Sequence, residues 1–347
     1  MQPWRTQSDL ARELAVIVPI YFGTTADEGL MERLLRMTIV DLPAFVRPEQ
    51  VWLMVDGDGH SGPVARRVLA GLSPSAQGMH LVDNRENQGK LGVLRQGFSA
   101  ALEAHPQVNW LAALDGDGDH LAAALPTLVR SAAAMAASCG HGRVVMIGAR
   151  ASRERPMGWV RGQMETLLDG LTIDALTYAL ARQGRALDLA FCRPGVVPDI
   201  SSGYKVYGRE LAALLFADPD PDTGSLSPWD YWHYAPETVP AVEATLLGGV
   251  IGEMPRPTWD GQPVSSFGAF GLERMYGELL AWVWTRLQIP LTVAVQHWEN
   301  HRRSYELDTS QEGAELLAKT RSRALGRLAE ALGEDPPGPC RPLLPFL

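Results

Sequence analysis

The sequence predicts an α/β fold in which a mostly parallel, Rossmann-like sheet is flanked by helices and followed by a C-terminal helical extension. Short apolar runs, typical of strands that are buried on both faces, recur between residues 15 and 147. Segments with apolar residues at helical spacing separate these runs. Strands that alternate with helices favour a parallel sheet, in which ligands bind beyond the carboxyl ends of the strands.

The predicted strands of the first half end in two acidic, glycine-rich loops. In chain order these strands are 15–20, 51–55, 79–82, 109–114 and 144–147. The second ends in Asp56-Gly57-Asp58-Gly59, and the fourth ends in Asp115-Gly116-Asp117-Gly118-Asp119. A later strand is predicted at 250–255. Both acidic loops are therefore expected at the edge of the sheet where ligands bind.

Helical patterns follow the third and the fourth of these predicted strands. Leu91, Leu94, Phe98 and Leu102 share one helical face, and a similar face begins at Leu121. Residues 158–184 and 270–332 are also predicted to be helical, whereas 191–222 is rich in loop-forming residues. These patterns divide the chain into an N-terminal arm (1–13), an α/β domain (14–268), a helical extension (269–334) and a Pro-rich tail (335–347).

Composition excludes several classes of protein. Lys and Arg number 31 against 40 Asp and Glu, and the resulting net charge of −9 argues against a general nucleic-acid binder. The three scattered cysteines do not form a metal or disulfide motif. The charged N-terminus lacks the apolar core of a signal peptide. The nearest approach to a membrane span, 279–298, is interrupted by polar residues, so we expect a cytoplasmic protein with at most peripheral membrane contact.

The Asp115-Gly116-Asp117 segment predicts a divalent metal site. Two carboxylates separated by one small residue can converge on Mg²⁺ or Mn²⁺, which prefer oxygen ligands. The competing interpretation of this tripeptide is a solvated acidic turn. An EF-hand loop is excluded because His120 stands where Gly is required and Pro126 where Glu is required.

Two segments upstream of Asp115 suit the diphosphate and the base of a nucleotide. Residues 87–90 (Asn-Gln-Gly-Lys) open a predicted helix, and a helix N-terminus followed by Lys favours an anion such as a diphosphate. A carboxylate of Asp56 or Asp58 at the end of the second strand could accept a hydrogen bond from a nucleobase. An ordinary helix cap and a tight turn are the respective alternatives.

The order of these motifs resembles the family 2 nucleotide-sugar glycosyltransferases with the GT-A fold, and most closely their polyprenyl- or dolichyl-phosphate branch. The matching segments cover about residues 14 to 256; they are 17–21, 55–62, 87–102, 114–120, 148–150 and 199–205. The resemblance implies transfer of a sugar from a UDP- or GDP-sugar, with inversion at the anomeric carbon. The acceptor it implies is a polyprenyl phosphate or a soluble small molecule.

The resemblance also implies roles for individual residues. The donor would be bound by Pro19, Tyr21, Asp56 or Asp58, Asn87, Lys90, Asp115 and Arg150. The metal would be held by Asp115 and Asp117, with Asp119 as a further ligand. Ser202, Gly203 and Lys205 would form the floor of the transfer site, where Lys205 would assist the departure of the diphosphate.

A hydroxyl acceptor requires a general base. The resemblance implies a carboxylate at the head of the helix before the last strand, which Glu237 fits best, with Asp230 and Glu243 in reserve; a helix N-terminal charge is the alternative for Glu237. Trp229 and Trp232 could stack on the acceptor, although a core or dimer contact is the alternative for such aromatic residues. His297 and His301 share a helical face, so His297 is a candidate for a further metal ligand; packed helix histidines are the alternative.

Three departures from the lipid-phosphate branch leave the acceptor open. Residues 259–266 lack the Arg of the branch's D-R-x-x-G-x-S element, the aromatic stretch 229–234 is unusual, and no membrane anchor follows. Two other functions stay open: a nucleotide-sugar-binding protein without transferase activity, and a sugar nucleotidyltransferase, although the loop at 21–25 lacks the Arg that the latter needs. A phosphatase or a dehydrogenase would need its motif after the first strand, where neither is found. The apolar runs near 279–295 also suit a homodimer contact.

Overall fold

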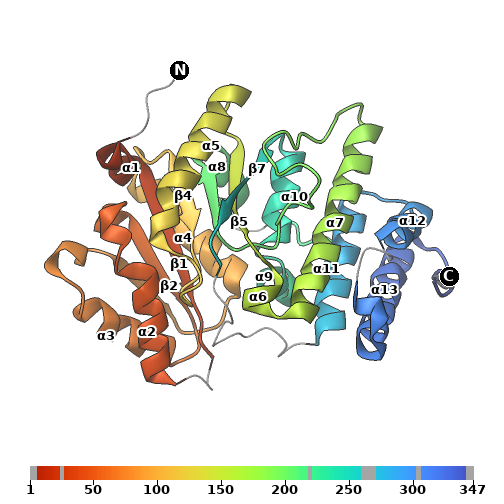
Figure 1. The fold of residues 1–347 in the computed structure, drawn as a ribbon, viewed down its shortest axis with the longest axis horizontal. Coiled ribbons are helices and arrows are strands. Elements are labelled where there is room, and N and C mark those ends of the chain that lie inside the picture. Colours follow the sequence, from red (N-terminus) through yellow and green to blue (C-terminus); the bar gives the residue numbers. More distant parts are fainter. Residues whose placement is uncertain (1–5, 24–26, 218–220, 259–270, 302–305, 341–347) are drawn as a thin grey trace.

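The predicted sheet is present in the computed structural model, which describes residues 6–23, 27–217, 221–258, 271–301 and 306–340. Seven strands lie in the order β3-β2-β1-β4-β6-β5-β7 (Figure 1). Their bounds are β1 Leu14–Ile20, β2 Val51–Asp56, β3 His80–Asn84, β4 Trp110–Ala113, β5 Val144–Arg150, β6 Lys205–Gly208 and β7 Val250–Arg256. Six of them were predicted from apolar runs, which reflects the burial of β1, β2, β4 and β5 along their whole lengths.

The strand β6 was not predicted and pairs antiparallel with both β4 and β5. It lies within 191–222, which the sequence analysis described as rich in loop-forming residues, and that segment also contains the helix α8 (Arg209–Phe216). The prediction failed there because β6 has only four residues, begins with Lys205 and ends with Gly208, and so lacks an apolar run. The other neighbouring strands are paired in parallel, so the sheet is mostly parallel as expected.

The strand register brings the two acidic loops to one edge of the sheet. Ile17 of β1 pairs with Ala113 of β4, and Ile20 pairs with Val55 of β2. The loops after β2 and β4 therefore flank the end of β1. Beyond the paired residues, the amide of Gly116 donates a 3.2 Å hydrogen bond to the carbonyl of Pro19, which fixes the Asp115–Asp117 turn against β1.

Helices cover both faces of the sheet (Figure 1). Their bounds are α1 Gln7–Glu13, α2 Glu28–Ile39, α3 Ser61–Ala70, α4 Lys90–Ala104, α5 Leu125–Cys139, α6 Glu154–Met157, α7 Trp159–Arg182, α8 Arg209–Phe216, α9 Pro228–Tyr234, α10 Thr238–Leu246, α11 Leu272–Arg286, α12 Leu291–His301 and α13 Gln311–Leu332. Alternate residues of β1 enter different cores. Val16 and Val18 join the core that contains residues of α2, α3 and α5, whereas Ile17 joins the core that contains residues of α4.

The expected C-terminal helical extension consists of α11, α12 and α13. Its buried residues Trp282, Trp284 and Leu325 belong to the same hydrophobic core as Ile17 of the sheet. The helices α11 and α12 both contact α7. The extension is thus built onto one face of the sheet. The segment 259–266, where the sequence departs from the lipid-phosphate branch, lies outside the described residues.

One helical segment of the described chain, Ala122–Cys139, is long and apolar enough to cross a membrane by length and composition. This segment includes α5, which contacts β5, β6 and β7. Its apolar residues Leu125, Leu128 and Val129 are buried in the core against the sheet. Core packing therefore accounts for the hydropathy of this helix.

Candidate active site

A cavity of about 280 Å³ opens where the loops after β1, β2 and β4 meet the first turn of α4. Pro19, Tyr21, Asp56, Asn87 and Lys90 line it, together with Asp115, Asp117 and Glu237. These eight residues come from most of the motifs in the first 120 residues and from the segment before α10. The structure thus brings together the central part of the predicted site, at the edge of the sheet where ligands of parallel sheets bind.

Lys90 is the central cation of this cavity. Its Nζ lies 2.9 Å from both carboxylate oxygens of Asp115 and 2.6 Å from Oε1 of Glu237. Burial alone would lower the pKa of Lys90, but the two carboxylates outweigh it and hold that pKa above its usual range. The pKa of Asp115 is correspondingly held low by Lys90, against the effect of its own burial. Lys90 and Asp115 are therefore a charged pair at neutral pH.

Local backbone geometry aims Lys90 into the cavity. Gly89 precedes α4 with a φ of +76°, a conformation that favours glycine. A Cβ on Gly89 would lie 2.3 Å from the carbonyl oxygen of Trp232, so α9 packs directly against this backbone. The first turn of α4 consequently enters the cavity with its N-terminal amides, which favour anionic groups.

Gly203 is required by the same ion pair. A Cβ at this position would lie 2.6 Å from Oδ2 of Asp115 and 2.9 Å from Nζ of Lys90. The sequence prediction placed Gly203 against the acceptor, but the structure places it against the Lys90–Asp115 pair, and it does not line the cavity.

We expect Gly203→Ala to displace Lys90 from Asp115 and to weaken nucleotide binding by about tenfold or more, since each 1.4 kcal/mol is a factor of ten. Gly326→Ala is the matched control, because a Cβ at Gly326 of α13 meets nothing within 4 Å. The control should bind nucleotide normally and gain up to about 1 kcal/mol of stability from helix propensity. Calorimetric titration of both variants with nucleoside diphosphate measures the difference, and equal affinity would contradict this account of Gly203.

Asp115 and Asp117 fit a divalent cation. Oδ1 of Asp115 is buried, and its 2.9 Å ion-pair contact with Nζ of Lys90 leaves it without a further hydrogen bond among the described residues. Burial, then the neighbouring charges of Asp115 and Asp119, raise the pKa of Asp117 to about 7. Two half-buried carboxylates whose like charges repel each other are a favourable environment for Mg²⁺ or Mn²⁺. In the part of the chain that the structure describes, His, Cys, Asp and Glu do not form a metal-holding group of three or more. Asp115 and Asp117 would supply two carboxylates, the usual number for Mg²⁺ that also binds substrate phosphates.

The other two predicted metal ligands are placed elsewhere. Oδ2 of Asp119 lies 2.9 Å from Nη2 of Arg256, and this buried ion pair turns the carboxylate toward β7. His297 lies on α12, with its ring 6.2 Å from that of Tyr178 on the distal part of α7. It does not line the cavity. The structure thus gives Asp119 an ion-pair partner and places His297 outside the cavity, and their assignment as metal ligands stays a prediction.

The structure also separates Asp56 from Asp58. Asp56 lines the cavity with only 4% of its surface exposed, and burial raises the pKa of its carboxyl. The carboxylate of Asp58 instead accepts hydrogen bonds from the amides of Phe22, Gly23, His60 and Ser61. Burial opposes ionisation of Asp58, but these bonds and that of the Ser61 hydroxyl lower its pKa overall. Asp58 therefore stabilises the loops around the donor side, and Asp56 is the residue that can meet a nucleobase.

Asn87 is held at the rim of the cavity by His233. Oδ1 of Asn87 accepts from the amide of Gly89 at 2.9 Å and lies 2.8 Å from Nε2 of His233. Trp229 stacks on the ring of His233 at a centroid distance of 4.0 Å and is 43% exposed. Trp232 packs against Arg95 of α4, outside the cavity. The two tryptophans predicted to meet the acceptor thus pack around α9 and α4 instead.

Of the three candidate bases, only Glu237 lines the cavity. Asp230 accepts from the Ser227 hydroxyl at 2.8 Å and lies 3.0 Å from Nη2 of Arg274, so it fixes the start of α9. Glu243 forms a two-pronged ion pair with Arg286, at 2.6 and 2.8 Å. The carboxylate of Asp230 is thus engaged by the start of its own helix and by α11, outside the cavity, and its catalytic role stays a prediction.

Lys205, Ser202 and Arg150 lie behind the cavity wall. Burial lowers the pKa of Lys205 to about 8, and its ammonium donates to the carbonyls of Ile200 and Ser202. The Ser202 hydroxyl donates to the carbonyl of Gly148 at 2.8 Å. Arg150 pairs with Asp199 at 2.6 Å and with Glu165 at 2.7 Å. All three support the loop before β6 and do not line the cavity.

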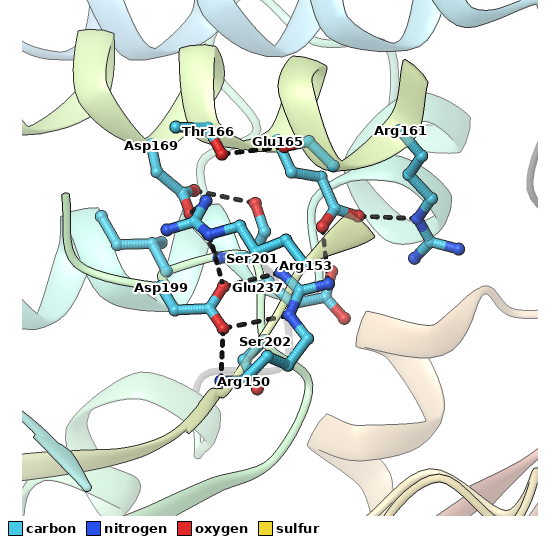
Figure 2. Close-up of polar contacts among 12 residues, drawn as sticks. Arg150, Arg153, Arg161, Glu165, Thr166, Asp169, Asp199, Ser201, Ser202 and Glu237 are labelled. Carbon is cyan, nitrogen blue, oxygen red and sulfur yellow. Dashed lines mark hydrogen bonds and ion pairs between the residues drawn. The ribbon is translucent and has the colours of Figure 1, made fainter. Parts of the chain in front are cut away.

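Sequence reasoning missed the wall that α7 and α11 supply. Arg161 and Glu165 of α7, Tyr276 of α11 and Ser201 of the loop before β6 line the cavity. Figure 2 shows Arg161, Glu165 and Ser201 joined to Arg150, Arg153 and Asp199 by ion pairs and hydrogen bonds. Ser201 belongs to the segment 199–205 that the motif comparison singled out. The two helices carry only a general amphipathic signal, which does not reveal a site.

No protein-family model and no curated protein matches the chain. Among solved structures, glucosyl-3-phosphoglycerate synthase from Mycobacterium tuberculosis, in complex with phosphoglyceric acid, is similar at a TM-score of 0.51 and 16% identity, over 84% of this chain and 87% of that one. A mycobacterial protein of unstated function is similar at 0.50 and 16%, over 84% and 81%. A mannosyltransferase from Pyrobaculum calidifontis, in complex with GDP-mannose and Mn²⁺, reaches 0.48 and 14%, over 95% and 91%. The chain therefore has the α/β fold of the GT-A glycosyltransferases, as the sequence predicts.

Proposed function

We propose that the protein is a metal-dependent glycosyltransferase that moves a sugar from a nucleoside-diphosphate sugar to an acceptor. The observation that carries this proposal is the Lys90 ammonium held between Asp115 and Glu237, 2.9 and 2.6 Å away, in the cavity that Asp56 and Asp117 also line. A cation, a pair of neighbouring carboxylates and a further carboxylate are the groups that such a reaction requires. The fold that the chain shares with glycosyltransferases supports the proposal.

The part of the cavity lined by Asp56, Lys90, Asp115 and Asp117, here called the donor half, suits both the base and the diphosphate of a nucleotide. Asp56, at the end of β2, can accept a hydrogen bond from the base of UDP or GDP. The first turn of α4 offers backbone amides and Lys90 to the diphosphate. Asp115 and Asp117 would hold Mg²⁺ or Mn²⁺, which when bound would offset the negative charge of the diphosphate. Pro19 and Tyr21 close this half on the side of β1.

The reaction follows from the residues beside Lys90. The oxygen of an acceptor hydroxyl forms a bond to the anomeric carbon, and the bond from that carbon to the diphosphate oxygen breaks. The nucleoside diphosphate leaves with the electron pair, and Lys90 stabilises the charge that develops on it. Glu237 takes the proton of the hydroxyl. Attack from the face opposite the leaving group inverts the anomeric configuration.

The acceptor class and the cellular location are parts of the same proposal. A soluble small molecule and a polyprenyl phosphate are the two acceptor classes that the sequence resemblance implies. Either acceptor class would place the reaction in the cytoplasm, and the second would add peripheral membrane contact. A nucleotide-sugar-binding protein without activity would share the donor half of the cavity and is separated by the assay below.

Calorimetry with UDP and GDP, with Mn²⁺ and then with EDTA, tests the donor site. We expect one nucleoside diphosphate to bind, with an affinity that falls at least about tenfold when the metal is removed. Incubation with UDP- and GDP-sugars, followed by mass spectrometry, should show slow metal-dependent hydrolysis. Binding that does not depend on metal would contradict the metal assignment, and binding without turnover of any donor would favour the inactive binding protein.

A further inference from the structure

The wall that α7 contributes to the cavity carries a charged pair. Nε of Arg161 lies 2.7 Å from Oε1 of Glu165, and both residues line the cavity. Their side chains are 20% and 6% exposed. The wall therefore presents a hydrogen-bond donor and an acceptor side by side, and their charges largely cancel.

A buried network holds this pair in place (Figure 2). Nη1 of Arg150 lies 2.7 Å from Oε2 of Glu165, and its Nε and Nη2 donate to the Asp199 carboxylate at 3.0 and 2.6 Å. The backbone amide of Arg150 donates to Asp199 as well, at 2.8 Å. Because Arg150, Glu165 and Asp199 are all buried, the carboxylate of Glu165 has little freedom to move. The wall is thus preorganised before any acceptor binds.

The same network orients Ser201, which also lines the cavity. The Ser201 hydroxyl donates to Asp169 at 2.8 Å, and Asp169 lies 2.7 Å from Nη1 of Arg153. With its proton committed to Asp169, the Ser201 oxygen presents its lone pairs as acceptors. Ser201 and Glu165 can accept from hydroxyl groups, and Arg161 can donate to them.

Apolar side chains fill the rest of this half of the cavity. Met157 of α6, Leu168 of α7, and Met275 and Leu279 of α11 all line it. They would contact the carbon skeleton of a ligand, while the polar group of Arg161, Glu165 and Ser201 meets its hydroxyls. The combination of hydroxyl-binding groups and an apolar wall suits an amphipathic molecule.

The net charge of the whole cavity, rather than that of the Arg161–Glu165 wall, disfavours an anionic acceptor. Among the described residues that line it, five carboxylates (Asp56, Asp115, Asp117, Glu165 and Glu237) face only two Lys and Arg side chains, Lys90 and Arg161. A divalent cation and the diphosphate of a donor roughly cancel one another. The excess of carboxylates therefore remains when the donor is bound, and it would repel a phosphate or carboxylate acceptor.

From this geometry we infer that the acceptor is a neutral, amphipathic polyol, with vicinal hydroxyls at the Arg161–Glu165 pair and Ser201 and an apolar portion against α6 and α11. The inference rests on the proposed glycosyltransferase activity and selects between the two acceptor classes left open there. The reacting hydroxyl of this polyol forms the new bond to the anomeric carbon, and its proton passes to Glu237.

A competition between acceptors tests this. The full-length protein, with Mn²⁺ and the donor identified by hydrolysis, is offered methyl β-D-glucopyranoside, octyl β-D-glucopyranoside, farnesyl phosphate and 3-phosphoglycerate. We expect kcat/KM for the octyl glycoside to exceed that for either phosphate by about tenfold or more, and to exceed that for the methyl glycoside. Equal or greater use of a phosphate would overturn the inference. Failure of donor hydrolysis would instead count against the proposed function, so the two failures are distinguishable.

Two variants locate the effect. Glu165→Gln should lower the ratio of transfer to hydrolysis with the octyl glycoside by about tenfold, because an amide cannot serve as the charged acceptor beside Arg161. Should this variant not fold, because it leaves two arginines less well neutralised, Met275→Ala is measured in its place and should reduce the preference for octyl over methyl glycoside. Met37→Ala, at an exposed position of α2, is the control. A ratio or preference that stays at the wild-type value in the measured variant would overturn the inference.

Discussion

Asp117→Ala is expected to lower the rate of sugar transfer on the order of 10³-fold or more, which is the size of effect seen when a group that stabilises transition-state charge is removed. Asp117 lines the cavity beside Asp115, and burial together with its acidic neighbours raises its pKa to about 7. Without its carboxylate, only Asp115 remains to hold the cation. Steady-state kinetics with the identified donor measure the loss, and calorimetry should show that Mn²⁺ no longer strengthens nucleotide binding.

When the metal is absent, removing the charge of Asp117 should raise the stability of the folded protein, although it abolishes transfer when the metal is present. The carboxyl of Asp117 titrates at about 7 in the folded protein against an ordinary value of 3.8. Between these values the folded state holds a proton that the unfolded state has released, so stability falls as pH rises and the loss is complete above pH 7. Asp117→Asn removes this penalty. In EDTA, the Tm of the variant should exceed that of the wild type, by an amount that grows from about pH 4 to pH 7.

A loss of transfer in Asp117→Ala together with a higher Tm of Asp117→Asn in EDTA would show that the Asp117 carboxylate serves function rather than stability. Asp41, an exposed residue in the turn after α2, provides the control, since Asp41→Asn should change neither the Tm nor transfer. If Asp117→Asn were less stable than the wild type at pH 8 in EDTA, or kept its Mn²⁺-dependent nucleotide binding, the assignment of Asp117 to the metal would be wrong.

The parts of the site that the sequence predicts are those carried by local signals. Asp115 and Asp117 follow a fully buried strand, and Lys90 opens a helix, so their positions depend on elements that apolar patterns reveal. Parallel pairing then brings strand ends together without further information. Glu237 is located by its place before α10. All four line the cavity, which explains why motif order was a useful guide here.

The other features of the site depend on tertiary contacts that local sequence patterns do not reveal. Asp56 and Asp58 are equivalent in the sequence, and only the amides of the neighbouring loops decide that Asp58 turns away from the cavity. Asp119 has the same residue type and spacing as a metal ligand, but Arg256 of β7 engages it from 137 residues away. The Arg161–Glu165 wall arises because α7 packs beside the sheet. Which of several similar side chains reaches a site is thus set by partners distant in the chain.

Glu237→Gln should lower kcat by about 10² to 10⁴-fold, the range for loss of a general base, while the KM for the donor changes little. The amide keeps the shape of the side chain and can still accept from Lys90, whose Nζ lies 2.6 Å from Oε1 of Glu237. It cannot take a proton from an acceptor hydroxyl. Initial rates at saturating donor, together with calorimetric nucleotide affinity, separate loss of chemistry from loss of binding.

Asp230→Asn is the matched control for this variant, because Asp230 lies in the neighbouring helix α9 but binds Ser227 and Arg274 outside the cavity. It should lower the Tm and leave kcat within about twofold of the wild type. The size of the Glu237→Gln effect also reports on the acceptor. A neutral hydroxyl needs a base and should show the full loss, whereas a phosphate acceptor is already ionised and should show little. A small effect with an intact donor site would therefore argue for a phosphate acceptor and against the neutral polyol.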